Sequence, residues 1–157
     1  MTKRMRKAVL SAVAALVLSG GALGYWLASG SGSGTASVVS PLPVVIGPGT
    51  PTSKLYPGGD ADVAVVVSNP NPFRVYLDKL DLDTGSGTGG FAVDGSHSGC
   101  GLSTLSYTSQ TVGQFVPPND GVTDGTLSLQ LANAVSMSQQ AADACQGATF
   151  TVYLQAG

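Results

Sequence analysis

The chain has 157 residues, of which 43% are hydrophobic and only 10% are charged, and its formal net charge is −2. This composition is too apolar for a wholly disordered chain. Beyond residue 28, three basic residues face nine aspartates, a formal charge of −6. That balance argues against nucleic acid and anionic lipid surfaces as partners, because both require a basic patch.

The first 28 residues combine a basic start with an apolar run. Four basic residues (Lys3, Arg4, Arg6 and Lys7) precede an uncharged stretch at residues 8–28. Basic residues of this kind stay on the cytoplasmic side while the apolar segment enters the bilayer. Everything after residue 28 is therefore expected outside the cytoplasm.

Two interpretations of this run stay open. Its 21 residues are long enough to cross ~30 Å of hydrocarbon as a helix that rises ~1.5 Å per residue. The run is then a transmembrane anchor, with Tyr25 and Trp26 at the outer interface. Alternatively, residues 8–18 belong to a cleaved signal peptide, and Ala22-Leu23-Gly24 offers the small residues that a signal peptidase reads. The protein is accordingly membrane-tethered at the cell surface or secreted.

Residues 29–37 (SGSGSGTAS) predict a flexible linker, and residues 38–157 an extracytoplasmic domain. Residues 38–46 are apolar but are interrupted by Pro41 and Pro43. Because proline cannot donate to a sheet ladder, this segment predicts an edge strand. The PGTP sequence that follows predicts a turn.

Residues 62–68 (DVAVVVS) form the strongest strand pattern in the chain. The segment is short, rich in β-branched residues and bounded by turn residues on both sides. Alternation places Val63, Val65 and Val67 on one face. The following Asn-Pro-Asn-Pro sequence at residues 69–72 predicts a turn, because each proline holds its own φ and keeps the preceding asparagine out of the helical region.

Residues 74–83 predict the next strand, in which the apolar residues change parity halfway along. A bulge near Asp78 and Lys79 would restore them to one face of the sheet. The four residues that this bulge brings to the core are Val75, Leu77, Leu80 and Leu82.

The remaining pattern predicts an all-β protein. Strands are expected at residues 91–93, 102–107, 111–116, 126–131 and 149–155, and residues 138–144 predict one or two helical turns. Some seven to eight short strands in a chain rich in Gly, Ser, Thr, Val and Ala are typical of an extracellular β domain. We expect a single antiparallel immunoglobulin-like β-sandwich after an N-terminal hydrophobic helix.

Cys100 and Cys145 are the only two cysteines of the chain. Because the leader places them in an oxidising compartment, they predict one disulfide. A redox or metal-binding role would require a CxxC spacing or clustered histidines, and the sequence has neither.

Two segments resemble known exported proteins. The LYPGGD sequence at residues 55–60, followed by the valine-rich strand and Asn69, resembles the opening of bacterial immunoglobulin-like surface domains. The ending DACQGATF at residues 143–150, with the basic leader, resembles a group of uncharacterised exported proteins of high-GC Gram-positive bacteria. The junction from Gly20 to Trp26 is similar to leaders of the camelysin and biofilm-fibre subunit family. These resemblances imply an exported β-sandwich and bring no catalytic residues.

Three aspartates form the candidate metal site. Asp78, Asp81 and Asp83 run into a Gly/Ser/Thr loop, and hard cations such as Ca²⁺ prefer several oxygen ligands from a tight loop. The carboxylate that an EF-hand loop requires near its end is missing, since Ala92 occupies that position. The alternative interpretation is a solvated strand face.

His97, the only histidine, lies in the loop GSHSG before Cys100. A hydrolase of the Ser/His/Asp type would use it, but no GxSxG motif accompanies it. An exposed loop histidine is the simpler interpretation.

These observations favour a non-catalytic structural or adhesive protein at the cell surface. It has no assigned cofactor, and its expected partners are a second copy of the chain or another surface protein. Residues 38–46 are the candidate for completing a neighbour's sheet. The alternative function is an extracellular module that binds a ligand, a carbohydrate or Ca²⁺.

Overall fold

The computed structural model describes residues 40–157. The expected signal peptide or anchor at 1–28, the linker at 29–37 and the first two residues of the expected domain lie outside the described residues. No helix within residues 40–157 is both long enough and apolar enough to span a membrane.

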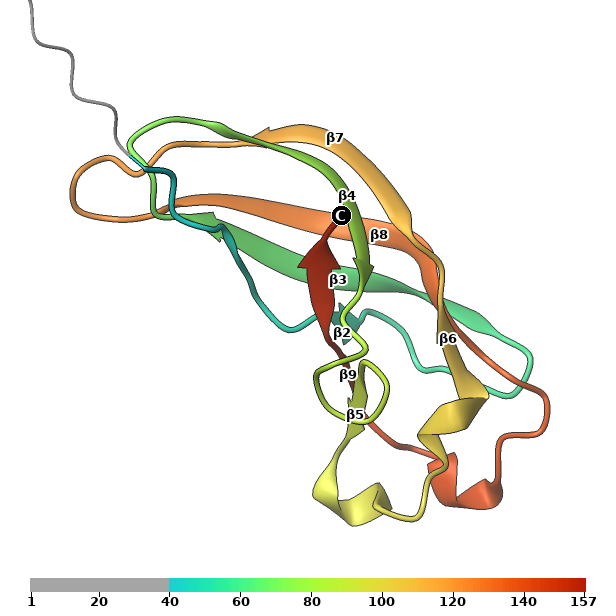
Figure 1. The fold of residues 1–157 in the computed structure, drawn as a ribbon. Helices are drawn as coiled ribbons and strands as arrows, with labels where there is room; N and C mark the ends of the chain where they lie inside the picture. Colours follow the sequence, from blue (N-terminus) through green and yellow to red (C-terminus); the bar gives the residue numbers. More distant parts are fainter. Residues whose placement is uncertain (1–39) are drawn as a thin grey trace, which may run out of the picture. The chain divides into compact units, whose positions relative to one another are not determined.

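Antiparallel strands are the main regular structure of residues 40–157, and the three helices described there are single 3₁₀ turns (Figure 1). In chain order the elements are β1 (Val45–Ile46), β2 (Thr50–Pro51), β3 (Asp60–Asn69), β4 (Val75–Leu82), β5 (Phe91–Val93), η1 (Gly95–His97), η2 (Leu102–Thr104), β6 (Leu105–Tyr107), β7 (Gln110–Val116), β8 (Gly125–Met137), η3 (Asp143–Cys145), β9 (Phe150–Val152) and β10 (Leu154–Ala156).

The strands form three sheets. The largest has the order β1–β3–β8–β6, and β2 also pairs with β3. A second sheet has the order β10–β4–β7, and β5 pairs with β9 in a small third sheet. Figure 1 shows β4 and β7 lying over β3 and β8, so the two larger sheets form two layers. All of these pairings are antiparallel, which confirms the all-β class.

Strand β3 is the centre of the largest sheet. Val63, Val65 and Val67 are 0%, 3% and 0% exposed, so the predicted core face is confirmed. Ala64 and Val66 point to the outer face, as a period of two requires. The strand is buried on one face only, which is the usual state of an antiparallel sheet.

A register shift lies where a bulge is predicted in the second strand, but the extra residue is on the partner strand β7 and not on β4. In the β4–β7 pair, Leu77 is opposite Gln114 but Lys79 is opposite Thr111, so the register shifts between them. Gly113 takes a left-handed φ of +62° on the longer side of this shift. The shift brings both Leu77 and Leu80 into the core, whereas Val75 and Leu82 at the strand ends stay half-buried.

Strand β8 is twice as long as its sequence pattern predicts, because a second bulge lies within it. Val63 pairs with Leu131, but Ala61 pairs with Val135. Within the extra residues, Asn133 has a left-handed φ of +48° and donates its backbone N–H to Asp62 Oδ1 at 2.8 Å. Because this bend interrupts the alternation of apolar and polar residues, the sequence pattern does not indicate that the strand continues beyond it.

Five other segments differ from the predictions. The edge strand expected at 38–46 is reduced, in its described part, to β1 at Val45–Ile46, because Pro41 and Pro43 precede it. The expected PGTP turn contains the short strand β2. The segment 102–107 begins as η2, and 149–155 divides into β9 and β10. The helical turn expected at 138–144 is the 3₁₀ turn η3.

One hydrophobic core receives side chains from all three sheets. Its buried members are Ala61, Val63, Val65, Val67, Leu77, Leu80, Phe91, Cys100, Leu105, Val116, Leu131, Ala134, Val135, Met137, Cys145, Phe150, Val152 and Leu154. Every buried side-chain nitrogen and oxygen in the described part of the chain has a hydrogen-bond partner, as the high cost of an unsatisfied buried polar group requires.

Candidate functional site

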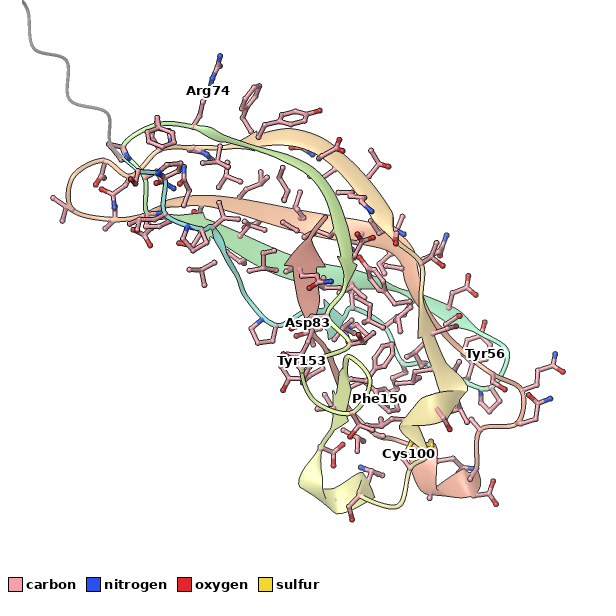
Figure 2. The ribbon with its side chains drawn as sticks, viewed as in Figure 1. Tyr56, Arg74, Asp83, Cys100, Phe150 and Tyr153 are labelled. Carbon is pink, nitrogen blue, oxygen red and sulfur yellow. A yellow bond between two sulfur atoms is a disulfide. The ribbon has the colours of Figure 1, made fainter. Side chains whose placement is uncertain are left out.

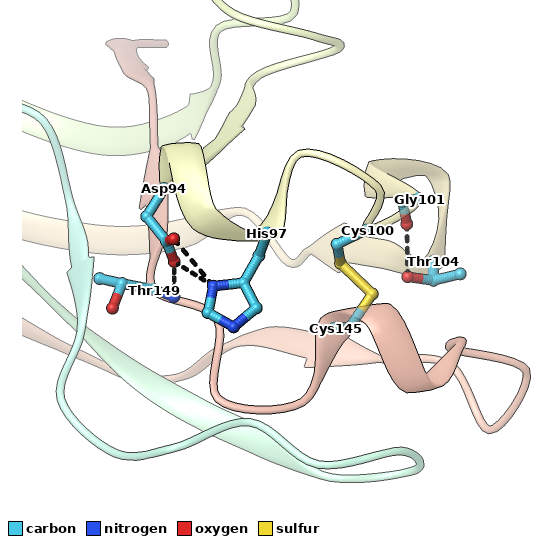
Figure 3. The surroundings of a disulfide bond; sticks show 7 residues. All are labelled: Asp94, His97, Cys100, Gly101, Thr104, Cys145 and Thr149. Atoms are coloured by element: carbon cyan, nitrogen blue, oxygen red, sulfur yellow. Dashed lines mark hydrogen bonds and ion pairs between the residues drawn. A yellow bond between two sulfur atoms is a disulfide. The ribbon is translucent and has the colours of Figure 1, made fainter.

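The predicted disulfide is present. Cys100 and Cys145 are bonded, and their Cα atoms are 4.6 Å apart. Cys100 follows η1 and Cys145 ends η3, so the bond joins the loops that lead from β5 to β6 and from β8 to β9 (Figure 3). Both cysteines are buried in the core, and the cross-link therefore has a structural position.

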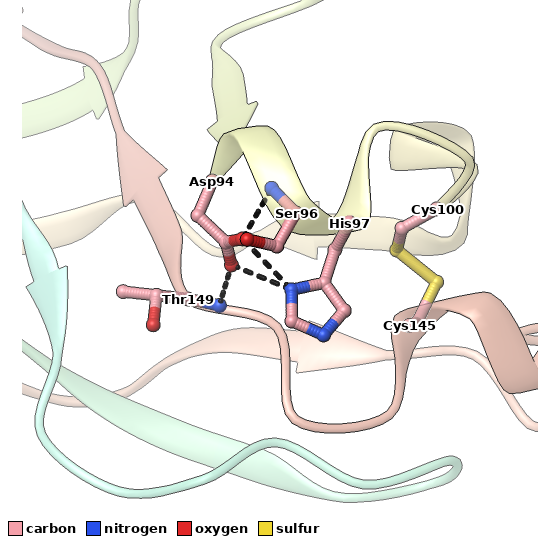
Figure 4. Close-up of polar contacts among 6 residues, drawn as sticks. All are labelled: Asp94, Ser96, His97, Cys100, Cys145 and Thr149. Carbon is pink, nitrogen blue, oxygen red and sulfur yellow. Dashed lines mark hydrogen bonds and ion pairs between the residues drawn. A yellow bond between two sulfur atoms is a disulfide. The ribbon is translucent and has the colours of Figure 1, made fainter.

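Asp94 and His97 form a polar cluster beside this cross-link (Figure 4). His97 Nδ1 lies 2.8 Å from Asp94 Oδ1, and the same carboxylate accepts backbone N–H groups from Ser96 at 3.0 Å and Thr149 at 2.7 Å. Asp94 thus caps η1 and ties it to the start of β9. His97 is half-buried and hydrogen-bonded to Asp94, whereas the sequence predicted an exposed loop histidine.

The bonds made by Asp94 are those of a structural carboxylate. The hollow beside it, about 400 Å³, is lined by Asp94 but not by His97. Ser96 contributes its backbone N–H to the cluster. Backbone donation from Thr149 is the main reason that the pKa of Asp94 is lowered, and the bond from His97 lowers it further.

This lowered pKa predicts an acid-dependent stability. The carboxylate of Asp94 stabilises the fold fully above its ordinary pKa of 3.8, and this contribution is lost as pH falls through the lower pKa of the folded state. We expect Asp94→Asn to be less stable than wild type at pH 7, and the difference to shrink below about pH 4. Urea unfolding at a series of pH values measures this.

The control for that measurement is Asp143→Asn on the other side of the cross-link. The Asp143 side chain bonds only to the exposed Gln146 amide, at 3.2 Å. Its loss is expected to change stability less at pH 7 than the loss of Asp94. An Asp94→Asn difference that stays constant from pH 7 to pH 2 would contradict the assignment.

The three candidate calcium ligands have separate partners. Asp81 pairs with Lys79 Nζ at 2.7 Å and accepts a hydrogen bond from Ser109 Oγ at 2.6 Å. Asp83 caps its own turn through Gly85 N–H, and Asp78 is exposed. Within residues 40–157, no three acidic, histidine or cysteine side chains gather closely enough to hold a metal ion. The structure therefore does not bring the predicted ligands together.

Asp81 also affects a neighbouring tyrosine. Tyr107 Oη donates to the Leu80 carbonyl at 3.2 Å. Burial, and to a smaller extent the negative charge of Asp81, raises the pKa of Tyr107 to about 12. Tyr107 therefore remains neutral and serves as a packing residue, as strand tyrosines commonly do.

Two buried asparagines form a network that the sequence analysis treated only as a turn. Asn69 and Asn71 are 0% and 1% exposed. The Asn69 amide nitrogen donates to the carbonyls of Phe73 and Pro117, both at 2.8 Å. Its oxygen accepts the backbone N–H of Asn71 at 3.0 Å and the Asn71 side-chain amide at 2.8 Å. This network closes one end of the two larger sheets.

The Asn71 side chain extends the network to the N-terminal part of the domain. Its oxygen accepts the Leu42 N–H at 2.7 Å, and its amide nitrogen donates to the Leu42 carbonyl at 2.8 Å. Its backbone carbonyl accepts the N–H of Asn119 at 2.8 Å. The Asn71 side chain thus bonds to both backbone groups of Leu42, as a neighbouring strand would, although Leu42 lies before β1.

An aromatic and cationic cluster lies on the outer face of the second sheet. Tyr76 of β4 is directly opposite Phe115 of β7, and their ring centroids are 5.1 Å apart in an edge-to-face arrangement. The guanidinium carbon of Arg74 is 4.4 Å from the centroid of the Phe115 ring. Tyr76 and Phe115 are 54% and 49% exposed. We call Arg74, Tyr76 and Phe115 the aromatic platform.

The platform lies far from the disulfide. Figure 2 shows Arg74 pointing outward near one end of the domain and Cys100 near the other end. The tyrosines in residues 40–157 are Tyr56, Tyr76, Tyr107 and Tyr153. Only Tyr76 joins the platform, and its aromatic partner is Phe115. The signal that could have found the pair is the shared outward parity of Tyr76 and Phe115 in two predicted strands.

No protein-family model, curated protein or solved structure matches this chain.

Proposed function

We propose that the protein is a non-catalytic structural or adhesive domain that is displayed outside the cytoplasm, tethered to the membrane or released. Its fold is an immunoglobulin-like β-sandwich. Two antiparallel sheets enclosing one core support this fold, as does the continuous segment from β6 to β7, which leaves the larger sheet and joins the second.

The cross-link supports the proposed location. Disulfides form and persist in oxidising compartments and are rare in the cytoplasm. The basic and apolar start of the sequence supports the same location independently. The net negative charge beyond residue 28 points to a partner other than nucleic acid or an anionic lipid surface.

The single observation that carries the adhesive role is the aromatic platform. Folding places most large apolar side chains inside, yet Tyr76 and Phe115 lie together on an outer sheet face, and Arg74 lies over the Phe115 ring. Aromatic residues and arginine are the residue types that dominate the energetics of protein contact surfaces. A rigid sheet fixes their geometry before contact, which lowers the entropy cost of binding.

A retention experiment tests this function. The protein is recovered as its producing cells export it, its intact mass is measured to identify the leader that remains, and it is coupled to beads. We expect the beads to retain cell envelopes from the same cells, and Tyr76→Ala with Phe115→Ala to reduce retention about tenfold, as loss of a central aromatic contact does.

The matched control is Tyr56→Ala. Tyr56 is also an exposed aromatic residue, at 65% exposure, and Figure 2 shows it well away from Arg74. Its loss is expected to leave retention unchanged. Equal retention by wild type and by the platform variant would overturn the adhesive role of this face.

A further inference from the structure

The aromatic platform contains one cation, Arg74, which forms no ion pair in residues 40–157. In the described residues, Asp81 forms an ion pair with Lys79, and Asp94 accepts its side-chain contact from His97. Within that part of the chain, Arg74 has no carboxylate partner. Its guanidinium lies against the face of Phe115, a contact that fixes its position without occupying its N–H donors. The planar set of N–H donors on the Arg74 guanidinium is therefore held in a fixed position at the protein surface.

The neighbouring tyrosine has an open side. At the register shift between β4 and β7, Gly113 of β7 takes its left-handed conformation, and a Cβ placed there would lie 3.6 Å from Tyr76 Oη. Because glycine has no side chain, nothing at this position stands beside the phenol. Tyr76 therefore offers both a ring surface and a hydroxyl next to the Arg74 guanidinium.

These groups fit one ligand chemistry. The C–H groups on the face of a sugar ring stack on an aromatic ring, and a carboxylate matches the planar donor pair of arginine. We propose that the aromatic platform binds an acidic polysaccharide, with a uronic acid ring on Tyr76 and its carboxylate on Arg74. This inference rests on the proposed adhesive function and names its ligand class.

Charge restricts where such a polymer makes contact. Residues 40–157 carry three basic residues and nine aspartates, so most of this surface repels a polyanion. Attraction is confined to the faces that carry an unpaired cation, and only Arg74 combines that cation with two exposed rings. Binding is therefore local to the platform and weakens with salt.

The test uses oligogalacturonate and its methyl ester as a matched pair. Both have the same sugar rings, but the ester lacks the negative charge. Titration of the exported protein followed by NMR or calorimetry is expected to show binding of the acid form, about tenfold weaker binding of the ester, and no such preference in Arg74→Gln. Tyr76→Ala is expected to weaken the binding of both forms.

Lys54→Gln is the charge-matched control. Lys54 is exposed, forms no ion pair in the described residues and lies outside the platform. It is expected to retain the full preference for the acid form, and melting curves of each variant establish that the fold is intact. Equal affinity for acid and ester, or no binding of either, would overturn the proposal.

Failure of this proposal is distinguishable from failure of the adhesive function. If envelopes are retained through the platform but protease treatment of the envelopes abolishes retention, the partner is a protein and the polysaccharide proposal is wrong. If wild-type beads retain no envelopes while the acid oligomer binds the platform, the adhesive role is wrong and the ligand class stands.

Discussion

Replacing Cys100 and Cys145 together by alanine is expected to lower the free energy of unfolding by about 4 kcal/mol. The two residues are 45 positions apart in the sequence. In the chain-entropy model, a cross-link over that separation lowers the conformational entropy of the unfolded chain and destabilises the unfolded state by this amount. Both sites are buried, and alanine avoids placing a hydroxyl in the core. Urea unfolding of the exported domain measures the loss.

Reduced wild-type protein provides the comparison for this variant. Because reduction opens the same loop without changing the sequence, its stability is expected to fall by a similar amount. The aromatic platform lies near the opposite end of the domain (Figure 2), so the proposed binding is expected to survive at temperatures where the variant remains folded. A loss below about 1 kcal/mol in the double variant would contradict the role given to the cross-link.

Asn69→Ala is expected to destabilise the domain by about 3 to 5 kcal/mol, a large change for a single residue. The substitution leaves the carbonyls of Phe73 and Pro117 without their donor and removes the acceptor of Asn71. Because this region is buried, water does not readily replace the lost partners. Asn69→Asp is expected to be equally harmful, since a carboxylate would face the same carbonyl oxygens.

Asn119→Ala is the matched control for this position. The Asn119 side chain bonds to Asp124 and to the N–H of Gly121, but both bonds are exposed to solvent. Its loss is expected to cost about 1 kcal/mol or less. Equal effects of the two alanine variants in chemical unfolding would mean that the buried network contributes little.

The local part of the fold is predictable from the sequence. Alternation in β3 identifies its buried face, because one side of that strand packs on the core and the other faces solvent. The parity change between Leu77 and Leu80 likewise predicts an irregularity in the pairing at this point, but it does not indicate that the extra residue lies on the partner strand β7. The cysteine pair follows from the expected compartment.

The remaining features depend on pairing that the sequence does not display. The extension of β8 to Met137 depends on the left-handed Asn133, which interrupts the period of two. The burial of Asn69 depends on its hydrogen bonds to the backbone carbonyls of residues 73 and 117. Because every residue has a backbone carbonyl, the sequence does not indicate which of them accept these bonds. The platform requires the register that sets Tyr76 opposite Phe115. Conversely, the spacing of Asp81 and Asp83 looked suitable for a cation, but Lys79 and a local turn engage their carboxylates.

The bonds between Leu42 and Asn71 determine how the domain responds to a pull on its N-terminal side. Followed from residue 40, the chain first hydrogen-bonds to another part of the domain at Leu42, before it reaches β1. Tension along the chain therefore loads these two hydrogen bonds before it loads the sheet, and both must break for the segment to move. Through Asn69 the force passes on to the backbone at Phe73 and Pro117. A tethered copy would thus carry mechanical load at its buried asparagines and spare the two-residue strand β1.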